Sequence, residues 1–180
     1  RDGWWRDRST RERVIGLCAL ALLCMLSYAF ARPAAESMFL EAHGAEALPK
    51  AWVLVALGAA GWVVLYNRFS TRVDLVVLYG AVCLIALAVM AGLILAWKAE
   101  LPGTGYALYV WKDLYIVVLV EIFYSFCNSV FPIRRARWFY GLFGLFGATG
   151  GVIGNLGVGV LAERVGSANS LWAVAPILVL

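Results

Sequence analysis

Residues 75–97 read LVVLYGAVCLIALAVMAGLILAW, a continuous apolar run that contains no charged side chain. A helix rises about 1.5 Å per residue, and roughly 20 residues are needed to cross the hydrocarbon core of a bilayer. The run is therefore long enough for one membrane-spanning helix, and it predicts that the chain is integral to a membrane.

The composition of the whole chain agrees with this prediction. Of its 180 residues, 63% are hydrophobic and only 14% are charged, and the mean hydropathy is +0.84. Soluble globular domains contain roughly 45–50% apolar and about 25% charged residues. The composition excludes a cytosolic enzyme, a disordered tail and a disulfide scaffold. The net charge of +4 does not indicate a nucleic-acid partner, because the basic residues lie in short segments between apolar runs.

The same reasoning predicts five complete spans and a sixth, incomplete one, at residues 14–40, 51–66, 75–97, 106–131, 138–162 and 170–180. Each run is continuous, without the alternation of a membrane β-strand, and lipid forces each segment to satisfy its own backbone, so we expect helices. The first span is long, and Pro33 predicts a bend in it. Because the chain starts at Arg1 and the last run stops at Leu180, we expect a piece of a larger protein.

The basic residues predict the orientation. With the N-terminal tail, residues 1–13, in the cytoplasm, the inside segments hold Arg1, Arg6, Arg8, Arg11, Arg13, Arg68, Arg72, Arg134, Arg135 and Arg137. The outside segments then hold only Lys50, Lys98 and Arg164. This asymmetry follows the positive-inside rule.

A secretory signal is the alternative for the N-terminus. Arginines, an apolar run and then Ala29-Phe30-Ala31 resemble a signal with its cleavage site. Pro33 just beyond the site and the further spans argue against it, and the downstream topology is the same in either case.

Charged residues inside the predicted spans are the best candidates for function. They are Arg32, Glu36, Lys112, Asp113 and Glu121. Each costs roughly 2.5–3.5 kcal/mol at mid-membrane, so such residues usually face a bundle interior or a water-filled cavity.

Their depths favour a shared site. Arg32 lies about 27 Å along the first helix from Val14, and Lys112 and Asp113 lie about 10 Å into the fourth span, which descends from outside. Arg32 and Glu36 are four residues apart, hence on one helix face. Either these charges line a polar vestibule, or they form local ion pairs and extend toward headgroups.

Glu121 lies deeper in the fourth span, with Ser125 and Asn128 on roughly the same face. This face either lines a pathway or holds helices together through hydrogen bonds.

Glycine is concentrated in the fifth span. Gly147–Gly151 and Gly150–Gly154 each match the G-x-x-x-G pattern, which lets two helix backbones approach closely. We expect these four glycines to pack helices. A phosphate loop is excluded, because no G-K-[ST] follows and no strand precedes them.

No catalytic, metal or cofactor site is expected. His43 is the single histidine and falls in an outer loop, so neither a Ser/His pair nor a Cys/His metal set can be built on it. Cys18, Cys24, Cys83 and Cys127 lie inside apolar runs without a C-x-x-C pair, which predicts small buried hydrophobes.

Three stretches carry a resemblance to a known family: RPAAES (32–37) followed by GAEALPK (44–50), YNRF (66–69), and CNSV (127–130) followed by ARWFYGLFGL (136–145). In this region, which spans Phe30–Gly151, the chain resembles the ATP/ADP translocase family, nucleotide carriers placed with the major facilitator superfamily.

The resemblance implies the N-terminal six-helix bundle of a transporter in a bacterial inner membrane. Arg32 matches the family's arginine, and Asp113 falls where the family has a functional glutamate. The family's lysine on the first helix falls at Ala35 here, and Lys112 is positioned to supply that charge.

Together these features predict an all-α integral membrane protein that works as a secondary transporter by alternating access. The expected solute is ATP/ADP or another small anion, bound by Arg32, Glu36, Lys112, Asp113, Glu121 and Asn128. The expected partners are the bilayer and the transporter's C-terminal half. The alternative is a non-transporting membrane anchor or assembly module for attached soluble domains.

Overall fold

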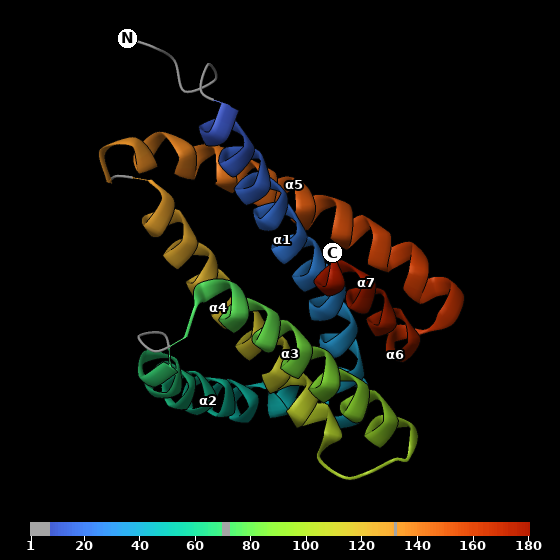
Figure 1. Ribbon diagram of the computed structural model, residues 1–180. Helices are drawn as coiled ribbons and strands as arrows, with labels where there is room; N and C mark the ends of the chain where they lie inside the picture. The colour runs from blue at the N-terminus through green and yellow to red at the C-terminus, as the bar shows by residue number, and fades with distance from the viewer. Residues whose placement is uncertain (1–7, 70–72, 132) are drawn as a thin grey trace.

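The computed structural model describes residues 8–69, 73–131 and 133–180, and nearly all of them are helical (Figure 1). The long helices are α1 (Arg8–His43), α2 (Leu48–Phe69), α3 (Leu75–Lys98), α4 (Thr104–Val130) and α5 (Ile133–Val165). The short elements are η2 (Ala45–Ala47), α6 (Ser167–Ser170), η3 (Leu171–Ala173) and α7 (Val174–Val179). No strand occurs in the described ranges.

Five helices in these ranges are long and apolar enough to cross a membrane. Each of the five complete spans predicted from the sequence falls in one of them; only Phe131, the extended residue that caps α4, lies outside its helix. The chain is therefore an all-α integral membrane protein. The arginines predicted on the cytoplasmic side include Arg1, Arg6 and Arg72, which lie outside the described residues.

α1 begins at Arg8, so residues 8–13 of the predicted N-terminal tail (1–13) are helical. The Arg8 Nε atom lies 2.9 Å from Glu12 Oε1, and such an i,i+4 ion pair favours a helical first turn. At its other end, α1 continues through Pro33 to His43 as one helix.

The predicted sixth span is broken into three short elements. Gly166, at φ +82°, ends α5 and turns the chain into α6 at Ser167, three residues earlier than predicted. Pro176 has no N–H to bond the carbonyl of Trp172, so the turn before α7 tightens into the 3-10 helix η3.

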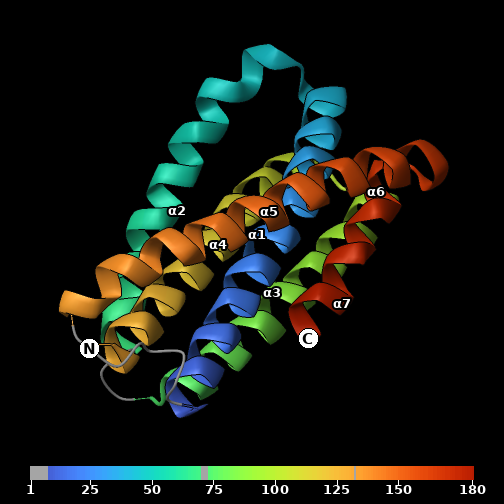
Figure 2. The same cartoon turned by 90° about the horizontal axis from the view of Figure 1, so that it is seen from above.

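Helices α1 and α4 form the centre of the bundle. α1 packs against α5, α4 and α7, whereas α4 packs against α3 and α2. In Figure 2 the beginning of α1, the end of α2 and the end of α4 lie toward the same end of the bundle. Trp111 Nε1 donates to the Ala86 carbonyl at 3.2 Å, which fastens α4 to α3.

Glycines on one face of α5 let it approach α1. A Cβ atom added at Gly150 would collide with the carbonyl oxygen of Leu22. A Cβ atom at Gly154 would lie 2.6 Å from the Cβ of Ala29. Both gaps are too small for any side chain, so these glycines allow the backbones of α1 and α5 to touch.

The other two glycines of the predicted packing motif differ from one another. Gly147 faces α1, where an added Cβ atom would lie 3.2 Å from Met25 Cγ. Gly151 has no atom within 4 Å of an added Cβ and therefore takes no part in this contact. The two G-x-x-x-G matches overlap, but only the pair Gly150–Gly154 has both members turned toward α1.

The four cysteines, Cys18, Cys24, Cys83 and Cys127, are buried and unpaired, as predicted.

Candidate functional site

A buried lysine on α4 is the centre of the candidate site. Lys112 is only 2% exposed. Its Nζ atom lies 2.9 Å from both carboxylate oxygens of Asp113 and 3.3 Å from Glu36 Oε1 on α1. An ammonium group in an apolar surrounding is very costly unless it is paired, and these two carboxylates supply the pairing.

Two further side chains of α1 extend this network. Arg32 Nε donates to Glu36 Oε1 at 3.0 Å, and the Tyr28 hydroxyl donates to Asp113 Oδ1 at 3.1 Å. Because Tyr28, Arg32 and Glu36 are four residues apart in sequence, they lie on one face of α1, which is turned toward α4. We call Tyr28, Arg32, Glu36, Lys112 and Asp113 the α1–α4 charge cluster.

An aromatic ring completes the surroundings of the lysine. The Nζ atom of Lys112 lies 4.0 Å from the centre of the Tyr109 ring, a distance typical of a cation–π contact. Trp52 Nε1 on α2 donates to the Tyr109 hydroxyl at 3.0 Å and holds this ring from the other side. Three helices thus contribute to the position of a single ammonium group.

Exposure increases across the cluster in one direction. The exposed fraction of the side chain is 2% for Lys112, 23% for Asp113, 33% for Glu36 and 56% for Arg32. Lys112 therefore lies behind its carboxylates, and Arg32 is the more accessible of the two cations. The two cations and two carboxylates have no net formal charge.

Glu121 lies apart from the cluster, although it lies on the same exposed stripe of α4. It is eight residues beyond Asp113, about 12 Å along the helix axis. Its side chain is exposed and makes no hydrogen bond or ion pair with the residues that the structure describes. The stripe between them includes Val117, which is also exposed.

Asn128, the last of the predicted site residues, joins two helices. Its Oδ1 atom accepts a 2.7 Å hydrogen bond from the Tyr140 hydroxyl on α5. Three residues earlier, the Ser125 hydroxyl lies 2.9 Å from the Tyr66 hydroxyl on α2. The part of this face near the C-terminal end of α4 therefore contributes to helix packing through hydrogen bonds.

The structure thus brings together four of the six residues predicted for the solute site, namely Arg32, Glu36, Lys112 and Asp113. These four residues form ion pairs with one another, which is one of the two interpretations left open by the sequence. Arg32 is the most exposed member of the cluster, and the vestibule interpretation stays a prediction.

Sequence reasoning missed the two tyrosines of this region. Tyr28 precedes Arg32 by one helical turn, and Tyr109 precedes Lys112 by three residues. On a helix, both spacings place the tyrosine next to a charged residue of the membrane span. A search for aromatic residues three or four positions from each such charge would have found both tyrosines.

Comparisons of the chain with protein-family profiles, with curated proteins and with solved structures find no match.

Proposed function

We propose that this chain is the N-terminal six-helix half of a facilitator-type secondary transporter, which carries a small anionic solute by alternating access. The observation that supports this most strongly is the α1–α4 charge cluster. Ionisable side chains inside membrane helices are costly and usually mark a substrate or ion pathway. Four of them in contact, open on one side, match that description.

The pattern of helix pairs gives independent support. α1 packs against α5 as α4 packs against α2, and α4 packs against α3 as α1 packs against α7. If α1, α2 and α3 are exchanged with α4, α5 and α7, in that order, each of these helix pairs becomes another pair that is also in contact. With residues 167–180 counted as the third span of the second set, each set has three spans and the second set runs in the opposite direction. This is the inverted repeat found within each half of facilitator-type transporters.

In this proposal Arg32 contacts the solute and Lys112 positions the carboxylates. Arginine carries five N–H donors in a planar fork that suits carboxylate and phosphate oxygens. An arriving anion competes with Glu36 for this fork. When it displaces Glu36, the carboxylate keeps Lys112 as its partner, so no charge is left unpaired. The second bundle of helices closes the site on its exposed side.

The resemblance to the ATP/ADP translocase family makes nucleotide exchange the first activity to test. The proposed location is a bacterial inner membrane with the N-terminus in the cytoplasm. The full-length protein is reconstituted into liposomes loaded with ADP, and uptake of labelled ATP is followed. Inorganic phosphate and small dicarboxylates replace the nucleotides in parallel vesicles.

We expect uptake that depends on the internal anion, is lost in Arg32→Ala and is unchanged in Arg8→Ala. Arg8 is a matched control, because it also pairs with a glutamate four residues on, far from the cluster. Folded protein that carries none of these anions would contradict the proposal and leave the role of a membrane anchor or assembly module.

A further inference from the structure

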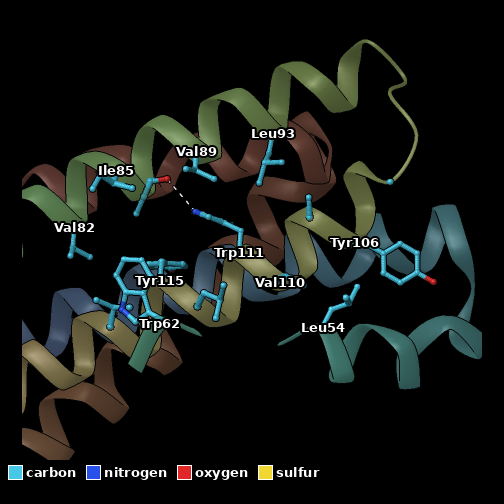
Figure 3. Close-up of a pocket in the computed structure, with 15 residues that line it drawn as sticks. Leu54, Trp62, Val82, Ile85, Val89, Leu93, Tyr106, Val110, Trp111 and Tyr115 are labelled. Carbon is cyan, nitrogen blue, oxygen red and sulfur yellow. Dashed lines mark hydrogen bonds between the residues drawn. The ribbon is translucent and has the colours of Figure 1, made fainter. Parts of the chain in front are cut away.

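A long apolar groove lies between α2 and α3, on the outside of α4. Its volume is about 600 Å³, and its lining is aliphatic and aromatic, including Leu54 and Trp62 on α2 and Val82, Val89 and Leu93 on α3 (Figure 3). None of the residues of the α1–α4 charge cluster lines it. The groove forms because α2 and α3 each pack against α4 and hardly touch one another.

The length of the groove matches one leaflet of a membrane. Val82 and Leu93 line it at its two ends along α3, and the eleven helical steps from one to the other span about 16 Å. The hydrocarbon core of a bilayer is about 30 Å thick, so one leaflet contributes about 15 Å. The groove is therefore about as long as one leaflet is thick, and its end at Leu93 and Gly103 lies close to the end of α3 and the start of α4, where we expect the level of the headgroups.

A cation lies where the groove reaches that level. A second cavity, of about 590 Å³, is lined by Pro49, Lys50 and Val53, and it shares Leu54 and Tyr106 with the groove. The Tyr106 ring lies at this end, with its hydroxyl pointing away from the aliphatic lining (Figure 3). Lys50 is exposed and forms no ion pair within the part of the chain that the structure describes.

We propose that the groove is a binding site for one phospholipid, with an acyl chain along α4 between α2 and α3 and the phosphate beside Lys50. The lining offers an acyl chain mainly apolar contacts. Of its two indole N–H groups, that of Trp111 is bonded to the Ala86 carbonyl, and that of Trp62 has no partner among the described residues. Lys50 is complementary to an anionic headgroup, and one basic residue near a membrane surface contributes about 1 kcal/mol to such binding.

The distribution of charge argues for a lipid rather than for a helix of a second protein. The lining is mainly apolar along its length, and the neighbouring cation, Lys50, lies at one end only, which matches a lipid with an apolar chain and a charged headgroup. The proposal does not depend on the transport function, because the groove and the α1–α4 charge cluster have no residue in common.

Native mass spectrometry of the full-length protein tests the proposal. The protein is taken from vesicles of equal parts phosphatidylglycerol and phosphatidylethanolamine into a detergent that strips loosely held lipid. We expect one retained phospholipid per chain, with phosphatidylglycerol at least about fivefold preferred. Val89→Trp fills the groove and is expected to abolish retention, whereas Lys50→Gln is expected to abolish the preference.

Two matched variants separate these effects from general ones. Val76→Trp makes the same change on an exposed part of α3 outside the groove, and Lys98→Gln removes a lysine from the same end of the bundle. Both are expected to retain lipid as the unchanged protein does. The proposal is overturned if no lipid is retained, if Val89→Trp and Lys50→Gln behave as these controls do, or if a lipid-free dimer is found that Val89→Trp disrupts.

Discussion

The ammonium group of Lys112 lies 3.3 Å from the Glu36 carboxylate and joins α4 to α1. Counting residues along the two helices predicted that the charges of these spans lie at similar depths, and this contact brings them to one level. Since Lys112 is almost completely buried, its role differs from that of the exposed Arg32, and the two cations can be separated by experiment.

Lys112→Met is expected to destabilise the fold. It removes the buried cation that Glu36 and Asp113 share, and losing one partner of a fully buried ion pair costs about 3–5 kcal/mol. Because both carboxylates are partly exposed, we expect about 2 kcal/mol. The measurement is the thermal unfolding midpoint in detergent. Arg8→Met, which removes an exposed pair, serves as the control, and equal midpoints for the two variants would refute this assignment.

Glu36→Gln is expected to strengthen anion binding. The Glu36 carboxylate occupies the guanidinium of Arg32, and a solvent-exposed pair of this kind is worth up to about 1 kcal/mol. Removing this competitor lowers the KM for the transported anion by up to about fivefold. A KM that rises in initial-rate measurements would show that Glu36 contacts the solute rather than competing with it.

Two substitutions on α4 separate a pathway residue from a packing residue. Asn128→Ala removes the acceptor of the Tyr140 hydroxyl and is expected to cost about 1 kcal/mol of stability. Glu121→Gln is expected to leave the unfolding midpoint unchanged, because this exposed carboxylate has no partner in the described part of the chain. It is expected to alter the transport rate, because the proposal places Glu121 on the stripe of α4 that lines the path of the solute. A destabilised Glu121→Gln protein with normal transport would reverse the two roles.

Neighbouring glycines of α5 are expected to respond oppositely to the same change. Gly150→Ala places a methyl group against the Leu22 carbonyl and separates α5 from α1, at a cost of about 1–3 kcal/mol. Gly151→Ala enters open space and gains up to about 1 kcal/mol from the better helix propensity of alanine. Thermal unfolding of both proteins checks the contact, and equal destabilisation would contradict it.

The sequence predicted the spans well, because continuous apolar runs of about 20 residues have one solution in lipid. It also singled out Arg32, Glu36, Lys112 and Asp113, since charges are rare in such runs. It did not distinguish Gly150 from Gly151, because the face that a helix turns toward its neighbour depends on the whole bundle. The sequence analysis also treated the last segment as one continuous span, because its residues form an apolar run. The break at η3 depends on Pro176, which that analysis did not consider.

The central claim is that the exposed stripe of α4 lines a water-filled path which opens to each side of the membrane in turn. Val117→Cys, between Asp113 and Glu121, tests this most directly in the full-length protein, using a membrane-impermeant maleimide added from one side at a time. Leu84→Cys, at an exposed position of α3, is the control that we expect to face lipid. The native cysteines are buried and are expected to react slowly.

We expect Val117→Cys to react from both sides of the membrane, each more slowly when transported solute is saturating, and Leu84→Cys to stay unlabelled. A Val117→Cys protein that resists the reagent from both sides, as Leu84→Cys does, would place this stripe in lipid or in a closed interface. That result would contradict the alternating-access account of the α1–α4 charge cluster.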